Sequence, residues 1–176
     1  MIKEFSVRPK PQNNIAKIVF FVTLMISGAG VATYLVIDKY RGVVGFLAML
    51  VLVSAILIYT KYIAPAFYYD IMLGEGDVAL FVVRQVVGKR QTTLCRIAIS
   101  DIVSVTRETS VERRRHKTQK GVRRYNYAPT MFAPEVYRIT TRGKYENAEI
   151  LIECSEEFAN LLIEYSKEAK ERETEE

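Results

Sequence analysis

The chain has 176 residues, 49% of them apolar, which is enough for one modest domain plus an appendage. Its two cysteines have no CxxC spacing and its one histidine has no metal-binding cluster around it, so composition argues against a zinc site. The net charge of +5 is unevenly distributed, because the segment from Glu153 onward carries −6 and the first 152 residues therefore carry +11. A basic body of this kind predicts a negatively charged neighbour.

Two long uncharged runs predict a transmembrane helical hairpin over residues 15–64, preceded by an N-terminal tail at 1–14. The first span covers about 18–37, and twenty helical residues reach about 30 Å, the thickness of a hydrocarbon core. The second span covers about 42–62, and only four residues, DKYR, separate the two, so the helices must run antiparallel. The first run is too long for a cleaved signal peptide, and a second span follows it directly.

The basic residues around these spans predict their orientation. Lys3, Arg8, Lys10 and Lys17 precede the first span, and Lys61 and a strongly basic region follow the second. Under the positive-inside rule, we expect a multi-pass protein of the cell inner (plasma) membrane whose N-terminus and C-terminal domain are cytoplasmic.

Small residues mark both spans. Gly28 and Ala32 form a small-xxx-small pair, and Gly42, Gly45 and Ala48 line one face of the second span. They are interpreted either as the contact within the hairpin, which we favour, or as an oligomer interface. Because neither span contains Asp, Glu, His or Arg, we do not expect transport by this chain alone.

After Pro65 the apolar residues alternate as they do in β-strands. A closing helix is expected from Ser155, a suitable N-cap, and beyond Arg172 the acidic residues 173–176 are expected to fray. The predicted strands are Phe67–Leu73, Val78–Val87, Thr92–Ile99, Asp101–Val105, Glu135–Arg142 and Ala148–Cys154. The apolar stripe of the helix comprises Phe158, Leu161, Leu162, Tyr165 and Ala169.

Three features carry a family resemblance: the stretch IAISDIVSV at 97–105, the closing SEEFANLLIEY helix and the order of elements. In these features the chain resembles bacterial membrane-anchored pleckstrin-homology-like (PH-like) domain proteins with an N-terminal two-helix transmembrane hairpin. The resemblance covers roughly Phe67 to Lys170. It implies an α+β fold in which residues 66–172 form an antiparallel PH-like partial β-barrel with a C-terminal capping helix.

The chain departs from this family in two places. The family has seven strands and we predict six, so either a strand lies within Tyr125–Phe132 or the segment Thr109–Pro134 replaces one. The turn Gly74–Asp77 is acidic where phosphoinositide-binding members are basic, so we expect no phosphoinositide site there.

The stretch RRRHKTQKGVRR at 113–124, followed by aromatic residues, is the candidate lipid- or partner-binding segment and is predicted to be an inserted loop. Three interpretations compete: contact with anionic lipid headgroups of the bilayer, docking of an acidic protein or a second copy, or a solvated loop without a ligand. A membrane anchor makes nucleic acid an unnatural partner. The candidate residues are Arg113, Arg114, Arg115, Lys117, Lys120, Arg123, Arg124, Tyr125 and Tyr127.

The sequence contains no recognisable set of catalytic, cofactor-binding or metal-ligating residues. The one histidine, His116, has no evident carboxylate partner, and Cys95 and Cys154 fall at apolar positions of predicted strands. We therefore predict a non-catalytic adaptor or assembly module. The alternative is a small accessory subunit of a larger membrane complex for transport, secretion or cell-envelope work, bound through its hairpin.

Overall fold

The computed structural model describes residues 4–9, 14–74, 78–116, 121–143 and 147–175. Its contacts divide the chain into two compact units. The hairpin unit comprises residues 12–65, and the sheet unit comprises residues 1–11 together with 66–176.

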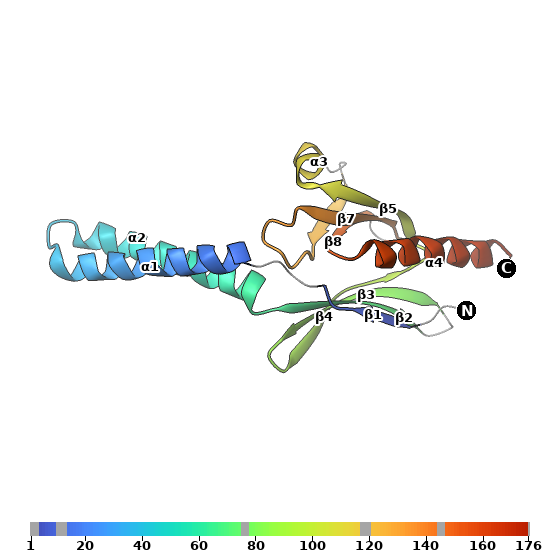
Figure 1. The fold of residues 1–176 in the computed structure, drawn as a ribbon, viewed down its shortest axis with the longest axis horizontal. Helices are drawn as coiled ribbons and strands as arrows, with labels where there is room; N and C mark the ends of the chain where they lie inside the picture. Colours follow the sequence, from blue (N-terminus) through green and yellow to red (C-terminus); the bar gives the residue numbers. More distant parts are fainter. Residues whose placement is uncertain (1–3, 10–13, 75–77, 117–120, 144–146, 176) are drawn as a thin grey trace. The chain divides into compact units, whose positions relative to one another are not determined.

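The hairpin unit consists of two antiparallel helices that lie side by side (Figure 1). Helix α1 spans Asn14–Val36, and α2 spans Arg41–Ile58 and continues into a π-helical turn, η1, at Tyr59–Ile63. Both segments, 14–36 and 41–63, are 23 residues long and apolar enough to cross a membrane. The prediction of two long apolar helices is confirmed.

Close contact between the helices depends on small residues. A Cβ atom on Gly30 would lie 2.8 Å from Cβ of Ala48, and one on Gly45 would lie 2.9 Å from the ring of Tyr34. The predicted small residue Gly28 faces the other way, because a Cβ atom there would meet nothing within 4 Å. Gly45 and Ala48 therefore belong to the hairpin contact that we favoured, whereas Gly28 does not.

The sheet unit contains two four-stranded sheets. The first has the order β1-β2-β3-β4 and the second the order β5-β7-β8-β6, and every pair is antiparallel except β6 with β8. The strands are β1 (Phe5–Val7), β2 (Ala66–Leu73), β3 (Ala79–Val87), β4 (Arg90–Ala98), β5 (Ile102–Thr109), β6 (Arg123–Asn126), β7 (Glu135–Arg142) and β8 (Asn147–Ile152).

Helix α4, Glu156–Glu175, lies between the two sheets and closes their shared core (Figure 1). The ring of Phe158 is the centre of this core, with its centroid 6.2 Å from Phe5, 6.4 Å from Tyr69 and 6.3 Å from Phe81. Ser155 acts as the predicted N-cap, since its Oγ accepts a hydrogen bond from Phe158 N at 3.3 Å. The helix extends to Glu175, past the predicted end near Arg172.

The α+β class and the six predicted strands are confirmed, and there are two further short strands, of which only the second was foreseen, as one of two alternatives. Strand β1 lies inside the predicted N-terminal tail and pairs antiparallel with β2, with Val7 opposite Tyr69. Strand β6 lies at the end of the basic stretch, beginning two residues before the window Tyr125–Phe132. The prediction of an inserted loop is wrong for the described part of that stretch, because β5 extends to Thr109 and a helix, α3 (Ser110–Arg115), follows it directly.

Candidate anion-contacting surface and the polar cluster behind it

The basic stretch begins on α3, whose first turn is locally stabilised. Thr109 and Glu112 form a capping box, in which Thr109 Oγ1 accepts from Glu112 N at 3.4 Å and Thr109 N donates to Glu112 Oε2 at 2.8 Å. These bonds to the carboxylate lower the pKa of Glu112, because they favour its charged form. The capping box fixes where the helix starts and thereby places three consecutive arginines in its last turn.

These three arginines differ in their exposure and contacts. Arg113 is half-buried, and its Nη2 donates a hydrogen bond to the carbonyl oxygen of Ala133 at 2.8 Å, so it holds α3 to the neighbouring segment. Arg114 and Arg115 are exposed. The predicted residues Lys117 and Lys120 lie outside the described residues.

The remaining candidates lie on β6 or just after it. Arg123 and Arg124 are exposed, whereas Tyr125 and Tyr127 are half-buried against the core. The two tyrosine rings stack, with centroids 6.1 Å apart and planes 6° apart, and Tyr127 Oη donates to the carbonyl oxygen of Leu94 at 3.3 Å. Burial raises the pKa of Tyr127 to about 12, so the phenol is neutral near pH 7. The arginines face solvent, while the tyrosines contribute mainly to packing.

A polar cluster that the sequence did not reveal lies at the C-terminal end of α3. His116 Nε2 lies 2.9 Å from Glu149 Oε1, and His116 Nδ1 lies 2.9 Å from Arg138 Nη1. Arg138 also forms an ion pair with Glu108. The expectation that His116 lacks a carboxylate partner is therefore wrong. Glu149 lies 33 residues away on another strand, so no local pattern could have identified it.

The hydrogen bonds of this cluster determine the protonation of the imidazole. A guanidinium can only donate, so Arg138 must donate to Nδ1, which then carries no proton. The remaining nitrogen, Nε2, carries the proton and donates it to the carboxylate of Glu149. These two contacts favour the Nε2–H tautomer, and they anchor the end of α3 to β7 and β8.

The cluster borders an open hollow of about 420 Å³ on the surface. Among the described residues, Oε2 of Glu108 and Nε of Arg138 are buried without a hydrogen-bond partner. The hollow is lined by Thr106, Arg107, Glu108, Glu112, Arg115 and His116. Its lining mixes both signs of charge, which does not select either anions or cations.

The cysteine side chains do not supply a nucleophile near neutral pH. Burial raises the pKa of Cys95 to about 11 and that of Cys154 to about 12. The thiolate is the reactive form, so both groups are chemically quiet at pH 7. Within the described part of the chain, no group of three or more His, Cys, Asp or Glu residues is placed to hold a metal ion.

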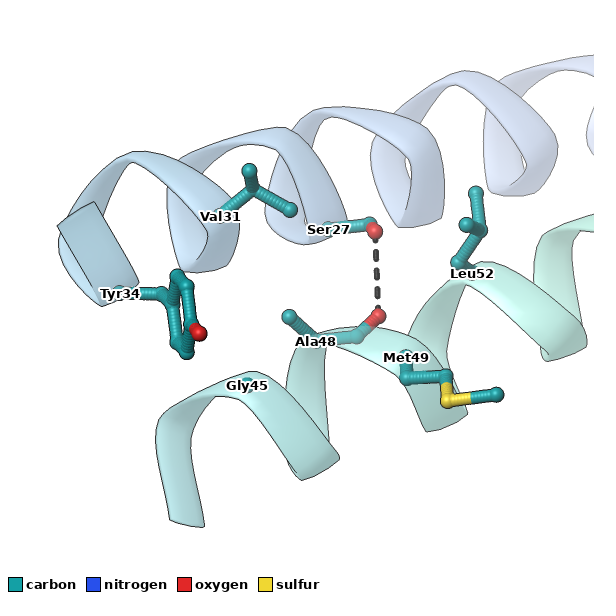
Figure 2. Close-up of a pocket in the computed structure, with 7 residues that line it drawn as sticks. All are labelled: Ser27, Val31, Tyr34, Gly45, Ala48, Met49 and Leu52. Atoms are coloured by element: carbon teal, nitrogen blue, oxygen red, sulfur yellow. Dashed lines mark hydrogen bonds between the residues drawn. The ribbon is translucent and has the colours of Figure 1, made fainter. Parts of the chain in front are cut away.

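The hairpin unit carries a separate apolar groove of about 410 Å³ (Figure 2). Figure 2 shows Ser27 of α1 facing Ala48 of α2, and Ser27 Oγ donates to the Ala48 carbonyl oxygen at 3.1 Å. The rest of the lining consists of Val31, Tyr34, Gly45, Met49 and Leu52. The hydroxyl of Ser27 is used in the helix contact, and the remaining lining suits lipid chains or another apolar helix.

Comparison with known proteins identifies no relative, because no family model, no curated protein and no solved structure matches the chain. Its function is therefore argued from its residues and their geometry.

Proposed function

We propose that the chain is a non-catalytic integral membrane protein in which the hairpin anchors a PH-like domain at the cytoplasmic face of the plasma membrane. The domain is an adaptor or assembly module whose basic surface contacts anionic lipid headgroups or an acidic partner. We define the basic surface by its exposed residues Arg114, Arg115, Arg123 and Arg124.

The observation that carries this proposal is the exposure of these arginines, in contrast to other arginines whose charge is neutralised by a carboxylate of the same domain. Arg84 pairs with Asp70, and Arg138 pairs with Glu108. Arg114 and Arg115 have no carboxylate partner among the described residues. Positive charge that the domain does not neutralise is available to an external anion.

The two apolar helices make a membrane surface the natural source of that anion. A lysine or arginine held near an anionic leaflet contributes about 1 kcal/mol, and this contribution decays within a Debye length of about 8–10 Å. The sheet order and the closing helix support the PH-like interpretation.

One observation favours the alternative function, an accessory subunit bound through its hairpin. Gly28 is exposed on α1 with open space around it, and Ala32, one turn later, is also exposed. Small residues on a lipid-facing helix surface permit close approach of another helix. A larger membrane complex would supply that helix.

Vesicle binding by the full chain distinguishes the two functions. The protein is placed in nanodiscs of phosphatidylcholine and mixed with vesicles that do or do not contain phosphatidylglycerol. We expect salt-sensitive co-flotation with the phosphatidylglycerol vesicles only, and at least about a tenfold loss of it in Arg114→Glu/Arg115→Glu.

Lys167, an exposed residue of α4, provides the matched control, because Lys167→Glu reverses a charge away from α3 and β6. Equal binding to both vesicle types, together with co-purification of a large partner that Gly28→Leu abolishes, would favour the subunit function instead.

A further inference from the structure

The two sheets leave a gap between two strand edges. Strand β4 is the last strand of the first sheet and pairs only with β3, while β6 is the last strand of the second sheet and pairs only with β8, within the described strands. A cavity of about 290 Å³ lies between them.

The backbone of β4 faces this gap. The carbonyl oxygen of Leu94 accepts the hydrogen bond from Tyr127 Oη and so points away from β3. A shift in the pairing between Val83 and Arg84 leaves Leu94 as an extra residue on β4, so the free edge has two short halves. Unpaired strand edges accept an extended peptide by backbone hydrogen bonding, which a lipid cannot reproduce.

The strands on both sides of the gap are basic. Arg90 and Arg96 lie on β4, and Arg123 and Arg124 lie on β6, while neither strand contains Asp or Glu. Arg90 and Arg96 are exposed and have no carboxylate partner among the described residues. Asp101 is the one acidic residue in the lining of the cavity. The charge of the gap is therefore complementary to an acidic ligand.

The wall of the cavity is largely apolar, and its apolar β4 and tyrosine side chains are half-buried, whereas Ile150 is buried. Leu94 and Ile97 contribute from β4, Tyr125 and Tyr127 from the end of β6, and Ile150 from β8. A volume of this size accommodates an aliphatic side chain, and Arg96 stands in the same lining.

We propose that the gap between β4 and β6 is a docking groove for an extended acidic segment of a partner protein. The segment adds to the free edge of β4, places an aliphatic side chain in the cavity and pairs its carboxylates with the flanking arginines. This inference rests on the proposed adaptor function and names the class of its partner.

The test uses the full chain in phosphatidylcholine nanodiscs and a fluorescent eight-residue peptide of alternating Glu and Val. The controls are the Lys–Val peptide and a Glu–Val peptide methylated on alternate backbone nitrogens, which keeps the side chains and removes strand pairing. Fluorescence anisotropy should show that the Glu–Val peptide binds at least about tenfold more tightly than either control. The methylated peptide tests strand pairing on the unmodified protein and does not depend on any variant folding.

Two double variants separate this groove from the vesicle-binding surface. Arg90→Glu/Arg96→Glu should weaken peptide binding by at least about tenfold and leave vesicle binding unchanged, whereas Arg114→Glu/Arg115→Glu should do the reverse. In a Cys154→Ser background, bound peptide should also slow alkylation of Cys95, which lines the cavity.

Equal binding of the three peptides would overturn the proposal, as would full peptide binding by Arg90→Glu/Arg96→Glu. Loss of vesicle binding in Arg90→Glu/Arg96→Glu without any binding of the Glu–Val peptide would assign these arginines to lipid and would also overturn it. Peptide binding by the unmodified chain without any vesicle binding would support the groove and contradict only the proposed lipid contact.

Discussion

Tyr69 is a polar side chain that lies wholly inside the core of the sheet unit. Its Oη donates to the carbonyl oxygen of Tyr127 at 3.0 Å and accepts from the backbone N of Glu153 at 3.3 Å. Burial raises the pKa of Tyr69, so the phenol keeps its proton and remains a donor. One hydroxyl thereby connects β2 to the ends of β6 and β8.

Tyr69→Phe should lower the free energy of unfolding by about 1–3 kcal/mol, because it leaves two backbone groups without this partner. Chemical denaturation in mild detergent, followed by tyrosine fluorescence, measures the change. Tyr68→Phe is the matched control on the adjacent residue, which is only half-buried, and its effect should be within about 0.5 kcal/mol of zero. Equal effects of the two substitutions would show that the Tyr69 hydroxyl does not contribute to stability.

The NMR signals of His116 can be observed without overlap from other histidines, since it is the one histidine of the chain. We expect the neutral-ring signals in ¹⁵N spectra of histidine-labelled protein to report the proton on Nε2 rather than on Nδ1, because Arg138 occupies Nδ1 as a donor. Arg138→Met should weaken that preference, because only the bond to Glu149 then favours the proton on Nε2. A ring protonated on Nδ1 in the unmodified protein would contradict the structure of the polar cluster.

The basic stretch was evident from the sequence, but the role of each arginine in it was not. Arg113 and Arg114 are adjacent and chemically identical, yet Arg113 bonds to a carbonyl oxygen 20 residues away while Arg114 faces solvent. Glu149 and Arg138 reach His116 only because β7 and β8 pair under the end of α3. Such roles depend on long-range pairing, which no local pattern encodes.

At the scale of elements, the hairpin contact depends on which glycine faces the other helix. Gly30→Val should push α1 and α2 apart and break the bond from Ser27 to Ala48, because the new Cβ would overlap Cβ of Ala48. Gly28→Val should not, since its Cβ would enter open space.

The separation is measured by electron paramagnetic resonance in nanodiscs, with spin labels at the exposed positions Met25 and Val53 and with both native cysteines replaced by serine. We expect a longer distance for Gly30→Val and an unchanged distance for Gly28→Val. The opposite order would place Gly28 in the contact.

Elements with a strong periodic signal were predicted well. Strand β7 and helix α4 repeat over enough residues to show their period, and β3 is a long run rich in β-branched residues. The predicted bounds of all three are close to those observed. Strands β1 and β6 have three and four residues, too few for a period to be visible. β1 exists because it pairs with β2, more than 60 residues later in the chain.

At the scale of the whole molecule, the chain joins an apolar hairpin to a sheet unit that carries exposed arginines. The length and composition of both helices were evident from the sequence, because a membrane span needs only about 20 consecutive apolar residues. The groove between β4 and β6 was not evident, because it arises where the edges of two sheets meet.

The central claim is that the hairpin crosses the plasma membrane and holds the sheet unit at the cytoplasmic face. The most direct test is trypsin digestion of sealed cells and of inside-out membrane vesicles that carry a C-terminally tagged chain. The account predicts that the basic residues beyond Pro65 are cleaved in the inside-out vesicles only. Cleavage beyond Pro65 from outside sealed cells would contradict it.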